Sequence, residues 1–171
     1  MRRPVQVRVN NLPAARFLFT KVREFGADPT DLLDIWGGVL EASTRSRFDT
    51  GSGPRGIPWP ISRRAAEQGG KTLVDRGNLE GSIRYEVRPG QLEVGVDGVG
   101  ASSKFARVHQ FGAVIRPVNA ESLRFQLPGG AWVFAQEVTI PARPFLGVDE
   151  DDKRDMREVG IEYLRSLKNG P

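Results

Sequence analysis

His109 is the only histidine of the 171 residues and the first side chain to consider for catalysis. It lies in the stretch FARVHQFGAVI, residues 105–115, with Ser102 and Ser103 shortly before it. A Ser-His-Asp site could use one of these serines, but no G-x-S-x-G elbow accompanies them. A typical zinc site needs several histidine, cysteine or carboxylate ligands, and the chain has no cysteine. We therefore expect no catalytic role and no metal, and predict that His109 hydrogen-bonds a backbone carbonyl in a turn.

The stretch AAEQGGKT, residues 65–72, is a relaxed match to a P-loop, with Ala65 in place of the first glycine. A P-loop follows a buried strand, and a helix begins at its Lys-Ser/Thr pair, so that backbone N–H groups surround the phosphates. The residues before Gln68 have a helical pattern instead, and no Walker B strand follows. An NTPase that uses Lys71 is thus the weakest functional hypothesis, and we expect no nucleotide or other cofactor.

Acidic side chains crowd residues 149–155, whose sequence is DEDDKRD. A calcium loop spaces its oxygen ligands and has a glycine at its sharp turn, and this run has neither feature. Aspartate and glutamate also favour the first turn of a helix, where the helix dipole is positive. We interpret the run as the start of a C-terminal helix.

A cluster of arginines in the first half of the chain could contact the DNA backbone. Its members are Arg45, Arg47, Arg55, Arg63 and Arg64. The net charge of +4 permits such contact without requiring it. No RNP, zinc-finger or helix-turn-helix signature is present, and Trp59 is the only good candidate for base stacking among these arginines. An accessory DNA-binding protein is therefore an alternative hypothesis, and sequence-specific recognition is not supported.

Length and composition indicate a single domain, residues 1–171, with a core of its own. The hydrophobic fraction of 39% and charged fraction of 27% are ordinary for a soluble globular protein. No apolar h-region follows the basic N-terminus, and no apolar run approaches the ~18 residues that cross a bilayer. We therefore expect no signal peptide, no membrane contact and a protein made in the cytosol.

Two long helices are predicted to position the candidate residues. Asp28 caps the first, which extends to about Phe48 because apolar residues recur at helical spacing. The second is the C-terminal helix with the acidic first turn, and a shorter helix is expected over 15–26. Gly37 and Gly38 each cost about 1 kcal/mol in a helix relative to alanine, so we expect another backbone to approach closely there.

Alternating apolar residues predict strands at 5–9 and in two hairpins, over 83–97 and 123–140. The return strand of the second hairpin is expected to be one continuous strand over 131–140. Strands joined mainly by hairpins predict an antiparallel sheet, with the long N-terminal-half helix and the C-terminal helix packed on it. The predicted fold class is therefore α+β.

A short helix is predicted between the two hairpins, started by Ser102 or Ser103 and ended by Gly112. A long loop rich in glycine and proline is predicted over about 49–62, around the large aromatic side chain of Trp59.

Four stretches of the chain resemble, in this order, the phage virion morphogenesis family of Mu-like tailed phages. They are FDTGSGPRGIPWPIS, GKTLVDRGNLEGSI, FARVHQFGAVI and IPARPFLGVDEDD. The resemblance covers residues 32–165, and although each motif alone is weak, four in the right order are fairly specific. The matching positions are Pro54, Gly56, Pro58, Trp59, Gly77, Leu79, Ser82, Ile83, His109, Gln110, Phe111, Gly112, Pro141, Ala142, Arg143, Pro144, Phe145, Leu146 and Gly147.

The resemblance implies a structural virion component without catalysis, because members of this family complete the tail or join head to tail. It also implies an oligomeric ring, such as a hexamer, around the DNA channel. The partners would be copies of the chain itself and the neck, connector and tail proteins of the phage. Assembly would take place in the cytoplasm of the bacterial host, and a basic lining could make non-specific contact with DNA.

Overall fold

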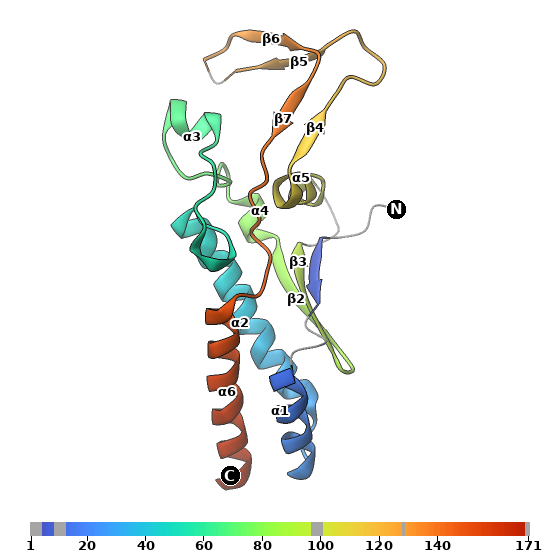
Figure 1. Ribbon diagram of the computed structural model, residues 1–171, viewed down its shortest axis with the longest axis vertical. Coiled ribbons are helices and arrows are strands. Elements are labelled where there is room, and N and C mark those ends of the chain that lie inside the picture. The colour runs from blue at the N-terminus through green and yellow to red at the C-terminus, as the bar shows by residue number, and fades with distance from the viewer. Residues whose placement is uncertain (1–4, 9–12, 97–100, 128, 170–171) are drawn as a thin grey trace.

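The computed structural model describes residues 5–8, 13–96, 101–127 and 129–169 (Figure 1). Its helices are α1 (Pro13–Glu24), α2 (Pro29–Thr50), the 3-10 turn η1 (Pro54–Gly56), α3 (Arg63–Gln68), α4 (Asn78–Gly81), α5 (Ala101–Phe111) and α6 (Glu150–Asn169). Its strands are β1 (Gln6–Arg8), β2 (Ile83–Arg88), β3 (Gln91–Val96), β4 (Ala113–Ile115), β5 (Leu123–Gln126), β6 (Trp132–Ala135) and β7 (Val138–Ile140). The α+β class predicted from the sequence is confirmed.

A three-stranded antiparallel sheet in the order β1-β3-β2 forms one layer of the body. The predicted hairpin is present, with Ile83 opposite Val96 and Val87 opposite Leu92. Alternate residues of β2 are turned towards the core, as the sequence pattern predicts for a strand with one buried face.

Helix α2 covers this sheet and contributes the largest part of the core. The Asp28 side chain accepts a hydrogen bond from the backbone N–H of Thr30 at 2.9 Å, which confirms the predicted cap. The helix ends at Gly51, which has the left-handed conformation (φ 67°) that glycine adopts without strain. The predicted close approach is found at Gly37, where it is the Tyr85 ring rather than a backbone that lies against the helix.

Helix α6 lies alongside α2 and α1 rather than on the sheet (Figure 1). The indole Nε1 of Trp36 in α2 donates to the carbonyl of Met156 in α6 at 2.7 Å, and Gly160 leaves room for Leu18 of α1. The expectation that the C-terminal helix packs directly on the sheet is thus corrected: α2 already covers that face, so α6 adds a further layer.

The predicted strand over 131–140 is interrupted by a bend after Ala135. β6, before the bend, pairs with β5, whereas β7, after it, pairs with β4. The two halves therefore belong to separate two-stranded sheets, and the single antiparallel sheet expected from the hairpins is wrong. Helix α5 begins at Ala101, so Ser102 and Ser103 lie in its first turn and not ahead of it, as a cap would.

Residues 113–127 and 129–140 form an arm that projects from the body (Figure 1). Its stalk is the β4–β7 ribbon, and its tip is the β5–β6 hairpin, at the end of the molecule away from the C-terminus of α6. Large apolar side chains are exposed on it, which is unusual for the surface of an isolated soluble protein. They are Val114, Ile115, Val118, Trp132 and Phe134.

Candidate functional site

The segment 141–147, which we call the strap, connects the arm to α6 in an extended form without regular secondary structure. Seven of its backbone polar groups are nevertheless hydrogen-bonded. They are the N–H groups of Arg143, Phe145 and Leu146 and the carbonyls of Pro144, Phe145, Leu146 and Gly147. Arg143, Phe145 and Leu146 of the strap are buried, and a buried backbone group without a partner costs about 1–3 kcal/mol, so these residues need such partners outside a sheet. Four of these seven groups are bound by the side chains of Gln110 and Trp59, which belong to other sequence motifs.

Gln110, in the last turn of α5, binds the strap as a neighbouring strand would. Its Oε1 accepts hydrogen bonds from the N–H groups of Phe145 and Leu146, both at 3.0 Å. Its Nε2 donates to the carbonyl of Leu146 at 2.9 Å. The carbonyl of His109 accepts from the N–H of Arg143 at 2.6 Å. The His-Gln pair of the third motif thus fixes the backbone of the fourth.

Trp59 holds the strap from the other side. Its indole Nε1 donates to the carbonyl of Pro144 at 2.9 Å. The Phe48 ring lies between Trp59, with centroids 5.4 Å apart, and Phe145, at 5.6 Å. All three rings are buried, and buried aromatic side chains contribute strongly to core stability. The large aromatic side chain of the predicted loop is therefore docked in the core, where it lies against the strap.

Two glycines allow the Pro-Trp loop and the strap to lie in contact. A Cβ atom on Gly53 would lie 2.5 Å from the carbonyl oxygen of Pro144, and one on Gly147 would lie 2.6 Å from Cγ of Pro54. Real Cβ atoms do not approach other heavy atoms so closely. Any larger residue at either position would push the loop away from the strap.

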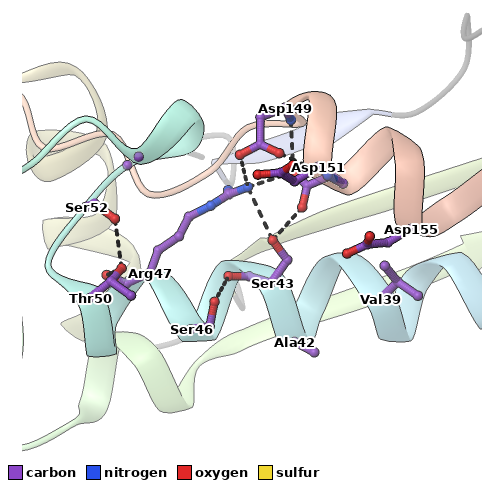
Figure 2. Close-up of a pocket in the computed structure, with 13 residues that line it drawn as sticks. Val39, Ala42, Ser43, Ser46, Arg47, Thr50, Ser52, Asp149, Asp151 and Asp155 are labelled. Atoms are coloured by element: carbon purple, nitrogen blue, oxygen red, sulfur yellow. Dashed lines mark hydrogen bonds and ion pairs between the residues drawn. The ribbon is translucent and has the colours of Figure 1, made fainter.

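Arg47 joins α2, the strap and α6 in a buried ion-pair network (Figure 2). Its Nη2 lies 2.7 Å from Oδ2 of Asp152 and 3.4 Å from Oδ2 of Asp149. Its Nη1 donates to the strap carbonyls of Phe145 at 2.9 Å and Gly147 at 3.0 Å. The guanidinium is planar and has several fixed donors, so it can bind two carbonyls and a carboxylate at once.

Asp149 and Asp152 cap α6 reciprocally. The N–H of Asp149 donates to Oδ2 of Asp152 at 2.9 Å, and the N–H of Asp152 donates to Oδ1 of Asp149 at 3.0 Å. Burial opposes the ionisation of Asp149, but hydrogen bonds from the N–H groups of Asp152 and Arg55 and the charge of Arg47 outweigh it, so the pKa of Asp149 lies below its ordinary value. The hydroxyl of Ser43 also donates to Asp152. The acidic run is therefore a helix start, as predicted, and in addition the counter-charge of a buried arginine.

The second motif shapes the start of β2. Gly77 has φ 72° and begins the short helix α4, in a conformation that favours glycine. Leu79 and Ile83 are buried, and the Ser82 hydroxyl donates to the carbonyl of Leu79 at 2.7 Å. Arg45 donates to the carbonyl of Ile83 at 3.1 Å. Because α4 packs against α5, this motif supports the helix that carries Gln110.

His109 is half-buried and lines a pocket of about 210 Å³ together with Gly77 and Leu79. Burial, and secondarily the charge of Arg143, lowers the pKa of His109, so the ring is neutral at pH 7. The predicted hydrogen bond from the His109 ring to a carbonyl is not found at Nδ1. This atom is buried and has no hydrogen-bond partner among the described residues. The backbone carbonyl of His109 binds the strap instead.

The remaining motif residues lie at the edges of this arrangement. Gly56 has φ 67° in the turn of the Pro-Trp loop, and Pro58 forms an isolated bridge with Ser52. Phe111 and Pro141 are exposed where the arm leaves and rejoins the body. These residues shape the chain without contributing a buried polar contact.

The P-loop hypothesis does not agree with the structure. Helix α3 (Arg63–Gln68) precedes the glycines, and no helix begins at Lys71. The Lys71 ammonium pairs with Asp49 at 2.6 Å. A phosphate cradle needs a strand before the loop and a helix after it, and neither is present.

The arginine cluster proposed to face DNA is divided by the fold. The expectation that Arg47 faces DNA is corrected, because Arg47 is buried in its ion-pair network and presents no charge to DNA. The guanidinium of Arg64 donates to the carbonyls of Lys71 and Val74, and that of Arg45 pairs with Glu41 and donates to Ile83. Two members remain exposed, Arg55 and Arg63, and the latter pairs with Glu67.

Within the described residues, no group of three or more histidine, cysteine, aspartate or glutamate side chains is placed to hold a metal ion. The described helices also include none that is both long and apolar enough to cross a membrane. Motif residues and Arg47 together form a clamp: the Pro-Trp loop, Gln110 and Arg47 hold the strap from several sides.

The chain belongs to the phage virion morphogenesis family, whose model matches residues 11–165. The resemblance noted from the four motifs is thereby confirmed. A curated relative from Haemophilus influenzae, named Mu-like prophage FluMu G protein 2, is 24% identical over 163 residues, covering 95% of this chain and 98% of the relative. No solved structure matches the chain. The protein is therefore a phage virion-assembly protein, and the clamp around the strap is formed by Arg47 together with residues of the motifs that indicated the family.

Proposed function

We propose that this protein completes the tail or joins the head to the tail, acting as a non-enzymatic ring of identical copies around the DNA channel. The observation that carries the proposal is the clamp. The motif residues are used to hold the strap and the base of the arm, and they include no paired nucleophile and base. Such a structural role for the motif residues is expected in a protein that presents a fixed surface to its neighbours.

The exposed apolar side chains of the arm support an assembly role as well. A monomer that stayed free in solution would expose such a surface to aggregation, whereas a virion component covers it when it meets its neighbours. We propose that these neighbours are further copies of the chain, in a ring such as a hexamer, and the neck, connector and tail proteins of the same phage. Assembly would take place in the cytoplasm of the host.

The proposal is tested by deleting the gene from a phage or inducible prophage that carries it and examining the lysate by electron microscopy. We expect separate heads and tails, or tails with an unfinished end, and recovery of infectious particles when the gene is supplied in trans. Normal, infectious particles in the deletion lysate would refute the proposal. The function depends on the clamp if the wild-type gene restores infectious particles and Gln110→Ala, which removes the Gln110 hydrogen bonds, does not.

A further inference from the structure

The tip of the arm carries an aromatic and cationic surface. Trp132 and Phe134 lie on one face of β6, and both are more than half exposed. Arg124 lies opposite Phe134 in the hairpin, with its guanidinium carbon 4.2 Å from the centre of a Trp132 ring and 6.0 Å from the Phe134 ring. A two-stranded hairpin is marginally stable by itself in water, so this exposed aromatic face favours a docked state.

The body carries a surface of matching character. A largely apolar pocket of about 340 Å³ lies beside the Pro-Trp loop, lined by Ile57, Trp59 and Pro144 among others, with Arg55 as the charged member of its lining. Gly53 lines both this pocket and an open cleft of about 600 Å³ beside α6. Four aspartates and Arg47 line the cleft, and Arg154 pairs with two of the four, Asp151 and Asp155, so an excess of negative charge remains. An apolar pocket with an acidic flank fits an aromatic surface with an arginine on it.

We propose that the arm tip of one copy docks on the pocket and cleft of a second copy of this chain. Trp132 fills the apolar pocket, and Arg124 lies towards the acidic cleft, near Asp151. The inference deepens the proposed function, since it names the contact that would join copies in a ring. The two surfaces differ from each other, so the contact is head-to-tail and can continue from copy to copy until a ring closes.

The absence of cysteine from the chain allows a direct test by disulfide trapping. Gln126 lies opposite Trp132 on the hairpin, and Ile57 is exposed at the pocket. We expect the double variant Gln126→Cys, Ile57→Cys, oxidised at high protein concentration, to give a ladder of covalent dimers, trimers and larger species. A disulfide requires Cα atoms within about 7 Å, so the ladder reports direct contact.

The control pairs Gln126→Cys with Phe17→Cys, an equally exposed position on α1, and should give no ladder. Adding Trp132→Ala to the first double variant should lower the yield of covalent oligomer by about tenfold, as expected for a central aromatic contact. The proposal is overturned if oxidation gives only monomer, with or without an internal disulfide. It is also overturned if the ladder is no stronger than that of the control pair.

Charge reversal provides a second test that does not depend on Trp132. In the trapping variant, Arg124→Glu should reduce the ladder, and a further Asp151→Arg should restore it. A ladder unchanged by Arg124→Glu contradicts the proposed orientation. The trapping and deletion experiments fail independently. If the gene supplied in trans restores infectious particles but no ladder forms, only the proposed contact between copies is wrong. If a ladder forms but the deletion lysate contains normal particles, only the proposed function is wrong.

Discussion

Replacing Arg47 by methionine tests the central contact of the clamp. Arg47→Met keeps an unbranched side chain of similar reach and removes the guanidinium. Asp152 and Asp149 then lose their cation, and the carbonyls of Phe145 and Gly147 lose their donors. Removing one partner of a buried ion pair costs about 3–5 kcal/mol, because the other charge is left buried without compensation. In a chain of this size, such a loss lowers Tm by roughly 6–20 °C.

The measurement is urea unfolding at pH 7, followed by tryptophan fluorescence. The matched control is Arg63→Met, which breaks the exposed pair of Arg63 with Glu67 and should cost less than about 1 kcal/mol. Adding Asp152→Asn to Arg47→Met should recover part of the loss, since the uncompensated charge is removed with its cation. A loss for Arg47→Met no greater than that of the control would refute the reasoning.

Four further substitutions test other parts of the fold by the same unfolding measurement. Trp59→Ala should cost about 3–5 kcal/mol, the range for a buried aromatic, and a loss under about 0.5 kcal/mol would mean that the loop is not docked. Gly37→Ala places a Cβ atom 2.2 Å from the Tyr85 ring and should cost about 1–3 kcal/mol. The Cβ atom of Gly38→Ala meets nothing within 4 Å, so this change should stabilise the helix by up to about 1 kcal/mol. If the two substitutions change stability in the same direction, the described packing is contradicted. Because the pKa of His109 is lowered in the fold, the unfolded chain binds a proton at this residue first as the pH falls through about 6.5. The stability of the fold therefore decreases from pH 7 to pH 5, and His109→Gln should reduce that decrease. Equal pH dependence of the two proteins would show that His109 does not titrate in this way.

Elements set by neighbouring residues were predictable from the sequence. The Asp28 cap and the first hairpin each depend on a few adjacent positions, and the structure has both. The acidic start of α6 belongs to the same group. By contrast, the strand predicted over 131–140 is locally continuous, and its break reflects a choice between two partner strands that no local pattern encodes.

The clamp could be predicted only in part. Trp59 and Gln110 were singled out by the family resemblance, but Arg47 was not, and the contacts were not predictable because Arg47 and Asp152 are 105 positions apart. Among neighbouring arginines, Arg47 was interpreted as a surface charge. Helical spacing does contain a signal: Arg47 follows the buried Leu40 by seven residues and so falls on the buried stripe of α2. A charged residue on such a stripe implies a buried partner elsewhere in the chain.

The clamp also determines how the arm is attached. A Cβ atom on Gly112, where the chain enters the arm, would lie 2.9 Å from the backbone nitrogen of Ala142, where the chain leaves it. The arm is thus a side excursion that departs from and returns to one point of the body, and insertions at such points leave the underlying fold intact. Its length and surface can change while the buried contacts beneath it are kept. The buried contacts of the clamp and the exposed apolar side chains of the arm therefore lie in separate stretches of one chain.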